Sequence, residues 1–361
     1  MSETAAVDAW AERIRECARA GTPIAITGGG SKHFYGNPVE GELLDTRAYA
    51  GIVDYEPVEL VVVARAGTPL ADIEAALAAE RQMLPFEPPH FGAGATLGGA
   101  IATGLSGPRR PYAGAARDLV LGVKVIDGNG TPLSFGGRVM KNVAGFDVSR
   151  LMTGALGTLG VLTEISLKCL PVPAKEVTRV LDCPADESIA RVNQWSGQAL
   201  PLSATCFAQG CLTIRLSGAA PAVDAAVRKL GGVALDDGPA FWRSVRDHTH
   251  AFFAGDLPLW RLSIKSTTPF TDLGGEQLVE WGGALRWLRP KAGATLDAAR
   301  LRAFAAAHGG HATLFRGYRD GDGASGVFHP LTPVIAGLHA RLKATFDPKR
   351  ILNRGRMYAE L

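Results

Sequence analysis

The sequence predicts an α+β protein with two domains, and three observations lead to this prediction. The chain has 361 residues, enough for a sizeable core and usually for more than one domain. Its 44 glycines are denser in the first part of the chain than in the rest. The order of expected strands and helices also changes after Pro171 and Pro173. We therefore expect one domain over residues 1–173, completed by 331–361, and a second domain over 174–330.

Composition excludes several classes of protein. Apolar residues make up 47% of the chain and charged residues 20%, as in ordinary globular proteins. The formal charge of +3 is too small to indicate nucleic-acid binding. The five cysteines include no C-x-x-C pair, which argues against an iron–sulfur cluster or zinc ribbon. An odd cysteine count without a secretory signal predicts free thiols and a cytoplasmic location, and residues 91–108 are too weakly apolar to be a transmembrane segment.

In the first domain we expect short helices and strands to alternate. Apolar residues at helical spacing predict an amphipathic helix at the N-terminus. A buried strand at 59–67 precedes a helix with Thr68 as its cap and Pro69 at its first position. Residues 118–137 predict a hairpin with a D-G-N-G turn, and residues 160–170 predict a further strand.

The second domain begins with a different order of elements. The pattern predicts strand, helix, two strands joined by a tight turn, helix and strand over residues 177–236, the order of a ferredoxin-like unit. The sequence shows no internal repeat. Trp281 and Trp287 are an even number of residues apart, so we expect them on one face of a strand. A last helix is expected to pack through one apolar face, formed by Leu331, Val334, Ile335, Leu338, Leu342 and Phe346.

A glycine loop follows the first expected strand. It contains Gly28, Gly29, Gly30, Ser31 and Lys32. A strand followed by such a loop often binds phosphate, because glycine lets backbone N–H groups converge on an anion. The order Ser-Lys does not fit a P-loop, and the missing third glycine does not fit the dinucleotide fingerprint. Lys32 is expected either to neutralise a phosphate or to be a solvated loop lysine.

Two further segments are rich in small residues. In 87–122, glycines, alanines and threonines follow one another with few bulky side chains between them. In 141–165, a short helix precedes Gly154, Gly157 and Gly160 and then a strand. Each segment fits either a set of tight turns or close contact with a ligand. Three such segments in one domain suit a long ligand with a pyrophosphate in its middle.

These segments resemble the vanillyl-alcohol-oxidase type (PCMH-type) FAD-binding family. The resemblance lies in the strand and GGGS loop, in GATLGGAIATGLSGPRR and in SRLMTGALGTLGVLTEI. Three further stretches, WGGALRWL, GGHAT and the tail NRGRMYAEL, are similar to the smaller flavin subunits of bacterial glycolate oxidases. The likeness extends over essentially the whole chain.

The resemblance implies a fold, a cofactor and partners. It implies a PCMH-type FAD-binding domain with a ferredoxin-like α+β cap domain, and FAD as the cofactor. The implied function is that of the FAD-binding subunit of a glycolate (2-hydroxy-acid) oxidase. That complex would oxidise glycolate to glyoxylate together with a larger flavin subunit and an iron–sulfur subunit. The implied location is cytoplasmic, or peripheral at the inner membrane through those partners.

The resemblance also implies the residues of the FAD site. The glycine loop and the start of the strand near Gly157 would bind pyrophosphate and adenosine. The middle segment would lie along pyrophosphate and isoalloxazine, and the tail would return to the flavin ring. Arg354 replaces the middle proline of the family's N-P-G element in this tail. The implied cofactor-binding residues are Gly28, Gly29, Gly30, Ser31, Lys32, Thr96, Gly99, Thr103, Asp118, Gly157, Gly160, Val161 and Asn353.

The sequence names no catalytic residue. Catalytic relatives carry GDGN-H and EHG-G segments that supply metal-binding and base histidines, whereas residues 317–331 here read GYRDGDGASGVFHPL and the second segment is missing. Removing a hydroxyl proton needs a base, so we expect the chain to work with partners. One alternative is a self-sufficient flavin oxidase whose base is His248, His250 or Tyr318. The other alternative is a non-catalytic flavoprotein scaffold.

Several other residues leave two interpretations open. His33 is either a covalent attachment point for flavin or a surface histidine. The pairs His248/His250 and His308/His311 have no carboxylate or cysteine at ligand spacing apart from Asp247, so no metal site is predicted. Three arginines are expected either to bind a substrate carboxylate or to form salt bridges and interfaces: Arg109, Arg110 and Arg117.

Overall fold

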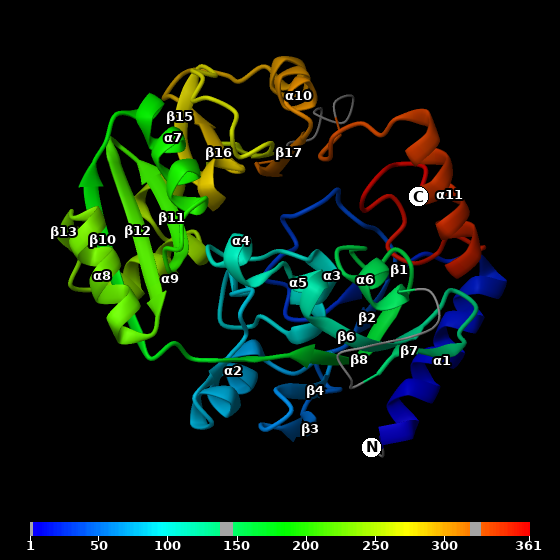
Figure 1. Cartoon of the computed structure of the whole chain (residues 1–361). Coiled ribbons are helices and arrows are strands. Elements are labelled where there is room, and N and C mark those ends of the chain that lie inside the picture. Colours follow the sequence, from blue (N-terminus) through cyan, green and yellow to red (C-terminus); the bar gives the residue numbers. More distant parts are fainter. Residues whose placement is uncertain (1–2, 138–146, 318–325) are drawn as a thin grey trace. The chain divides into compact units, whose positions relative to one another are not determined.

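The computed structural model describes residues 3–137, 147–317 and 326–361 (Figure 1). By its internal contacts the chain forms two compact units, and each is discontinuous in sequence. The second unit includes a short segment from the middle of the first. Unit 1 consists of Met1–Leu105, Ala115–Pro171 and Pro330–Leu361, and unit 2 of Ser106–Gly114 and Val172–His329.

An antiparallel five-stranded sheet forms the larger layer of unit 1. Two of its central strands, Val61–Arg65 and Val161–Lys168, are buried along almost their whole length, so both faces of each are covered. The helices of this layer pack their apolar residues into the same core. The strand order is β3 (Ile52–Glu56), β4 (Val61–Arg65), β8 (Val161–Lys168), β6 (Val120–Ile126) and β7 (Pro132–Gly136). The helices are α2 (Leu70–Ala79), α3 (Leu97–Thr103), α5 (Ala116–Leu119) and α6 (Val148–Met152), and a short pair is formed by β5 (Gln82–Met83) and β9 (Leu170–Pro171).

The expected hairpin is confirmed, since β6 pairs with β7 in antiparallel register. The side chain of Asp127 closes its turn by accepting the N–H groups of Asn129 at 2.9 Å and Thr131 at 2.8 Å. The start of α2 differs from the expectation. Pro69 is the residue before the helix, and the Thr68 hydroxyl bonds to the backbone of Gly51 and Arg65 instead of capping the helix.

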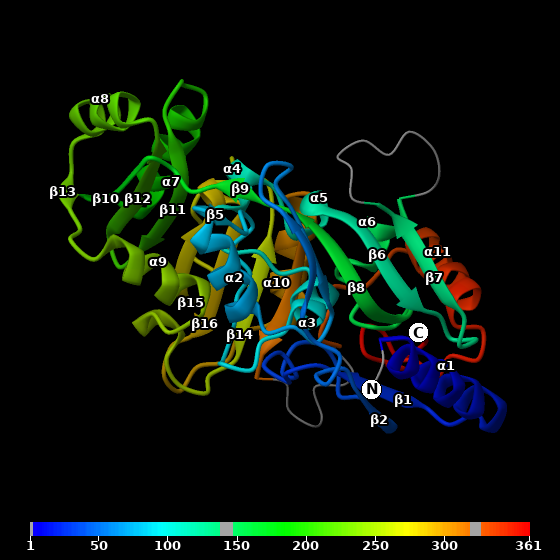
Figure 2. The same cartoon turned by 90° about the horizontal axis from the view of Figure 1, so that it is seen from below.

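A second, smaller layer of unit 1 contains residues from both ends of the chain (Figure 2). Helix α1 (Glu3–Ala20) buries Ile14 and Cys17 against β1 (Ile24–Thr27), as its periodicity predicts. Strand β1 pairs in parallel with β2 (Glu42–Asp45). The tail returns beside β1, where Ile24 forms an isolated bridge with Leu352. Residues distant in sequence therefore meet at this strand.

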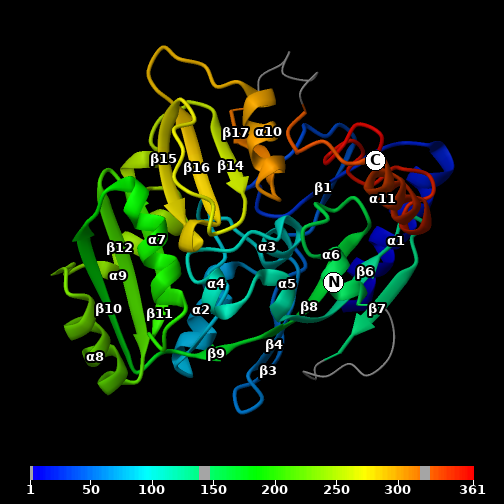
Figure 3. The ribbon, with the colours of Figure 1, turned by 45° about the horizontal axis from the view of Figure 1, so that its top comes forward.

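Unit 2 contains an antiparallel sheet of eight strands, shown in green to orange in Figure 3. Its first half has the strand order β13-β10-β12-β11, which is the order of a ferredoxin-like unit and confirms that prediction. Two helices connect these strands and pack their apolar residues against them. The elements are β10 (Lys175–Asp182), α7 (Ala185–Ser196), β11 (Leu202–Ala208), β12 (Cys211–Gly218), α8 (Ala220–Leu230) and β13 (Val233–Ala234).

The second half of the sheet repeats this topology in mirror order, β15-β16-β14-β17. The two halves meet where β11 pairs with β15. The first connecting helix is missing from the second half, because residues 264–274 are all described and form no helix. The expected lack of a repeat therefore holds for the sequence and not for the topology. The elements are β14 (Leu259–Ser263), β15 (Gly275–Glu280), β16 (Leu285–Pro290), α10 (Ala298–Ala307) and β17 (His311–Arg316), preceded by α9 (Gly238–Arg246) and the 3₁₀ turn η1 (Ala251–Phe253).

The two tryptophans do not share a strand, so that expectation is wrong. Strand β15 ends at Glu280, and Trp281 begins the turn η2 (Trp281–Gly283), whereas Trp287 lies in β16. Both side chains are buried, and their N–H groups bond to the carbonyl of Gly107 at 3.1 Å and to Glu280 at 2.7 Å. The helix α4 (Arg110–Ala113) lies in the same unit, with Arg110 over the Trp281 ring.

The last helix, α11 (Pro333–Phe346), belongs to unit 1 and packs differently from the expectation. Leu342 and Phe346 contact the core, but Val334 and Leu338 are 74% and 41% exposed. The apolar face is thus buried only at its C-terminal end. Within the described residues, no helix has both the length and the hydropathy that a membrane span requires.

Candidate cofactor site

Unit 1 contains a pocket of about 420 Å³, which lies in the size range of small-molecule sites. Its walls come from the loop after β1, from α3, from the start of β8 and from the tail after α11. Most residues that the resemblance implied come together here: Gly28, Gly29, Gly30, Ser31, Lys32, Thr96, Gly99, Thr103, Gly157, Gly160 and Asn353.

Two implied residues lie elsewhere. Val161 is the first residue of β8, is fully buried and packs with Ile24 and Leu352 in the smaller layer. Asp118 lines a different pocket of about 630 Å³, beside Arg117. Its carboxylate accepts the N–H of Ala115 at 3.0 Å and caps the short helix α5. The structure therefore places neither side chain at the first pocket.

Close contact between two chain segments explains the glycines after β1. A Cβ at Gly29 would lie 1.3 Å from the carbonyl oxygen of Gly94, and one at Gly28 would lie 2.4 Å from the Thr96 hydroxyl. Gly30 has a φ of 73°, which glycine adopts at no steric cost. The loop needs glycine for packing as well as for access of a ligand to its N–H groups.

Gly99 has a different environment from Gly29. A Cβ added at Gly99 would meet only the Thr96 hydroxyl, at 3.3 Å. That hydroxyl accepts the N–H of Gly99 at the start of α3, and the Thr103 hydroxyl donates to the Gly99 carbonyl at 2.9 Å. The two threonines fix the helix, while Gly99 leaves space in the pocket.

Two cations line the pocket. The ammonium of Lys32 is 3.3 Å from the carbonyl of His90, and its residue is only 7% exposed. Arg356 donates to the carbonyls of His33 at 3.0 Å and Asn37 at 2.9 Å, so it holds the tail against the glycine loop. The sequence did not single out Arg356, because its neighbours in the pocket come from the other end of the chain.

His33 also lines the pocket, and its Nε2 lies 2.9 Å from the Thr27 hydroxyl. Burial lowers the pKa of His33, and Arg356 lowers it further. A neutral imidazole is therefore expected at pH 7. The pocket then carries positive charge from Lys32 and Arg356.

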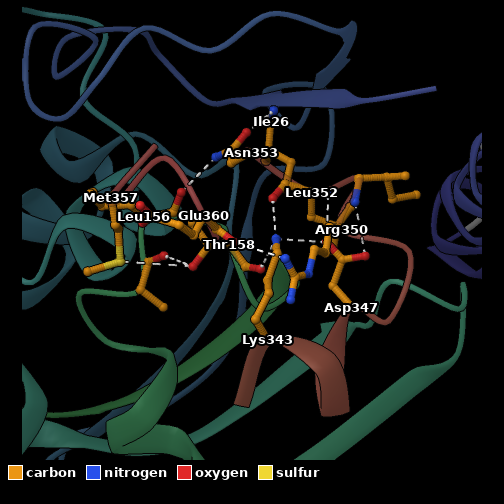
Figure 4. A network of polar contacts seen from close by, with 12 residues as sticks. Ile26, Leu156, Thr158, Lys343, Asp347, Arg350, Leu352, Asn353, Met357 and Glu360 are labelled. Atoms are coloured by element: carbon orange, nitrogen blue, oxygen red, sulfur yellow. Dashed lines mark hydrogen bonds and ion pairs between the residues drawn. The ribbon is translucent and has the colours of Figure 1, made fainter. Parts of the chain in front are cut away.

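Asn353 joins three segments at the pocket wall (Figure 4). Its Oδ1 accepts the N–H of Ile26 at 2.8 Å, and its Nδ2 donates to the carbonyl of Leu156 at 2.6 Å. A Cβ at Gly157 would lie 2.6 Å from that Nδ2, so glycine is needed beside it. The φ of 40° at Asn353 is one that asparagine tolerates better than most residues. Its side chain braces the wall through the backbone of the other two segments.

The donor set of this pocket fits the pyrophosphate part of FAD. Glycine N–H groups, hydroxyls and two cations are the groups that bind phosphate oxygens in proteins. The same set does not suit a cationic ligand. Aliphatic side chains of Ile26, Leu156 and Leu162 supply apolar surface beside these donors.

Two candidate bases of the self-sufficient oxidase, His248 and His250, lie in unit 2. The third, Tyr318, is outside the described residues. The His248 ring stacks on Phe253 with centroids 3.9 Å apart and lies edge-on to Trp287. Burial lowers its pKa well below the ordinary value, and Arg316 and Arg261 act in the same direction. His250 accepts the N–H of Phe252 at 3.2 Å, so it caps a turn.

The other candidates have structural contacts. Arg109 forms an ion pair with Glu176 at 2.7 Å, while Arg110 covers the Trp281 ring at 4.3 Å. His308 lies 2.8 Å from the carbonyl of Phe304. Burial and neighbouring cations lower the pKa of His311 to about 4. In the part of the chain that the structure describes, no three His, Cys, Asp or Glu side chains gather as a metal site would require. All five cysteines are free thiols.

Comparison with known proteins places this chain in a family. Residues 4–136 match the family described as FAD binding domain, so the chain carries such a domain and FAD is its cofactor. The glycolate oxidase subunit GlcE of Escherichia coli (strain K12) is 47% identical over 350 residues, which are 97% of this chain and 97% of that protein. The predicted FAD-binding fold and cofactor are confirmed.

Other relatives match only in part. The mitochondrial D-lactate dehydrogenase [cytochrome] of Arabidopsis thaliana is 30% identical over 182 residues, 50% of this chain and 31% of that protein. The glycolate oxidase subunit GlcD of Bacillus subtilis (strain 168) is 31% identical over 164 residues, 45% of this chain and 35% of that protein. These relatives share a limited region with the chain.

Among solved structures, an alkyldihydroxyacetonephosphate synthase covers 95% of this chain with a TM-score of 0.65. The match covers 73% of that protein at 16% sequence identity, so it shows the fold alone. The 47% identity to GlcE, over 97% of both chains, shows the narrower family. The chain belongs to the family of the glycolate oxidase subunit GlcE, the FAD-binding subunits of an FAD-dependent oxidoreductase.

Proposed function

We propose that this chain acts in a complex that oxidises glycolate, or a similar small 2-hydroxy acid, to the 2-oxo acid. Its partners would be a larger flavin subunit and an iron–sulfur subunit. The observation that carries the proposal is the 47% identity to GlcE, which extends over 97% of both chains. In this proposal the chain works in the cytoplasm or at the inner membrane, to which partner subunits attach it.

The pocket of unit 1 is the FAD site of this proposal. The N–H groups of Gly28 to Ser31, with Lys32 and Arg356, would hold the pyrophosphate. Thr96, Gly99 and Thr103 would lie along its length, and Gly157 and Gly160 would allow the backbone of the strand start to approach it. Asn353 holds the wall in place. Bound FAD supplies the chemistry of accepting two electrons.

The described residues support dependence on partners. Oxidation of a 2-hydroxy acid releases two electrons and two protons, and a base must take the hydroxyl proton. His248 is enclosed by aromatic rings and His250 caps a turn, so neither is placed as such a base. The cysteine spacing offers no cluster to carry electrons onward. Partner subunits would supply the base and the electron acceptor.

The first test is the visible absorbance of the purified chain, before and after anaerobic addition of glycolate. We expect a flavin band that persists in the isolated chain and bleaches when the two partner subunits are present. Bleaching of the isolated chain would instead favour a self-sufficient oxidase. Failure to retain or rebind added FAD would favour the scaffold.

Substitution of both described candidate bases completes this test. His248→Asn and His250→Asn should leave turnover of the full complex within about twofold of the parent chain, because neither residue is placed to accept the proton. A loss of turnover with flavin still bound would place the base in unit 2 and contradict the proposed dependence on partners.

A further inference from the structure

Helix α11 buries a charged residue and exposes apolar ones. Lys343 is 1% exposed, whereas Val334 and Leu338 of the same helix are 74% and 41% exposed. Asp347, one turn further, is 0% exposed, and its carboxylate lies 2.8 Å from the Lys343 ammonium. A buried ion pair is costly unless hydrogen bonds satisfy both groups. The hydrogen-bond partners of Lys343 and Asp347 therefore identify the chain segments that this pair connects.

The ammonium has three hydrogen-bond partners. Besides Asp347, Lys343 donates to the carbonyl oxygens of Thr158 and Leu352, each at 2.8 Å. An ammonium has three N–H donors, so this set uses all of them. Burial lowers the pKa of Lys343, and the neighbouring carboxylate opposes that effect.

The carboxylate completes the connection to the tail. Asp347 accepts the N–H of Ile351 at 3.1 Å and that of Leu352 at 2.8 Å. Gly128 packs against the pair, since a Cβ there would lie 2.4 Å from the Asp347 carboxylate. The pair thus fixes both the N–H and the carbonyl of Leu352.

Lys343 contacts two segments (Figure 4), and each segment includes residues that line the cofactor pocket. Thr158 lies next to Gly157, whose neighbour Leu156 lines the pocket. Leu352 directly precedes Asn353, which bonds to Leu156 and to Ile26. One ammonium therefore ties the tail to the loop before β8, and Asn353 makes the second tie between the same segments.

We infer that Lys343 and Asp347 are positioning residues for the FAD site, acting through Asn353 and the loop at 156–158. The inference rests on the proposed function only in taking FAD as the ligand. Replacing Lys343 alone by an apolar residue would leave the Asp347 carboxylate buried without its ion-pair partner, which costs stability. It would also leave the carbonyls of Thr158 and Leu352 without their donor and the tail without its link to the loop before β8.

The test compares Lys343→Met with a matched control, Arg286→Met in unit 2. Arg286 is also fully buried and donates to backbone carbonyls, those of Thr268 and Pro269, but it belongs to unit 2 and does not line the pocket. We expect Lys343→Met to raise the Kd of the apoprotein for FAD at least about tenfold, and Arg286→Met to change it less than about twofold. Flavin fluorescence titration gives the Kd, and circular dichroism gives the unfolding midpoint of each apoprotein.

Amide hydrogen exchange of the apoprotein separates this inference from the proposed function. Lys343→Met should speed exchange at Ile26, whose N–H donates to the Asn353 side chain, and at Asn353, whose N–H donates to the carbonyl of Ile24. Exchange in β12 should not change. Asp347→Asn should produce the same pattern more weakly, and it replaces Lys343→Met if that variant does not fold. Unchanged exchange at Ile26 and Asn353 would overturn the inference, even in a chain that binds no FAD. Equal weakening of FAD binding by the two methionine variants would overturn it as well.

Discussion

At the scale of single residues, the glycines of the pocket have different structural roles. Gly29 is required by the contact of its loop with Gly94, whereas Gly99 borders open space. A sequence pattern predicts both as ligand-binding glycines, because it cannot show which backbone lies opposite. Only the second kind gives a clean test of ligand binding.

Gly99→Leu should therefore block FAD while leaving the fold intact. The new side chain would enter the pocket, and leucine favours a helix more than glycine does. We expect at least a tenfold rise in Kd for FAD, about 1.4 kcal/mol, with no fall in the unfolding midpoint of the apoprotein. Gly29→Ala is the contrasting control, since its Cβ would overlap the Gly94 carbonyl and lower that midpoint. Normal FAD binding by Gly99→Leu would remove α3 from the site.

His248 gives a prediction about pH. Its pKa is lowered well below 6.5 in the folded chain, so below this pH the unfolded state binds a proton that the folded state does not. Stability should consequently fall as pH drops from about 6.5 toward the folded pKa. Unfolding midpoints of unit 2 between pH 7 and pH 5 measure the slope. His248→Asn, whose side chain tolerates the positive φ at this position, should reduce the slope, and an unchanged slope would assign it to other groups.

At the scale of elements, periodicity predicted which residues share a face but not what that face contacts. The residues of α11 follow helical spacing, yet Leu342 packs against the core and Leu338 is exposed. The burial of Lys343 could not be predicted either, because its partners lie in the tail and in the loop before β8. The local sequence pattern determines where a helix or strand forms, whereas segments distant in the sequence determine which of its residues are buried.

Two leucines of α11 can measure this difference. Leu338→Ala should change the free energy of unfolding by less than about 0.5 kcal/mol, as is usual at exposed positions. Leu342→Ala should cost at least about 1 kcal/mol, because it removes contacts with the core of unit 1. Both substitutions are equally compatible with a helix, so chemical denaturation compares burial alone. Equal costs would show that the first half of α11 is covered in solution.

The two halves of the unit 2 sheet differ in how well the sequence predicts them. The first half was predicted because each strand and helix has its own turn residues and period. The second half lacks the helix between β14 and β15, and residues 264–274 connect those strands instead. Without that helix the element order no longer matches the motif, although the strand order does.

At the scale of the whole molecule, the pocket draws on the beginning, middle and end of the chain but only on unit 1. The glycine segments and the tail were predictable from the sequence because each carries a local pattern. Arg356 and Lys343 were not, since their roles arise only when the tail lies against distant segments. The cofactor should therefore stabilise a discontinuous set of residues.

FAD binding should then protect unit 1 much more than unit 2. A ligand that binds only the folded state, at a free concentration about 100 times its Kd, adds about 2.7 kcal/mol to stability. Amide exchange with and without FAD reports this for each strand. We expect slower exchange in β8, whose first residues adjoin the pocket, and little change in β12 of unit 2. Equal protection of β12 would mean that the two units unfold as one body, and thermal unfolding of the apoprotein should then show a single transition for both.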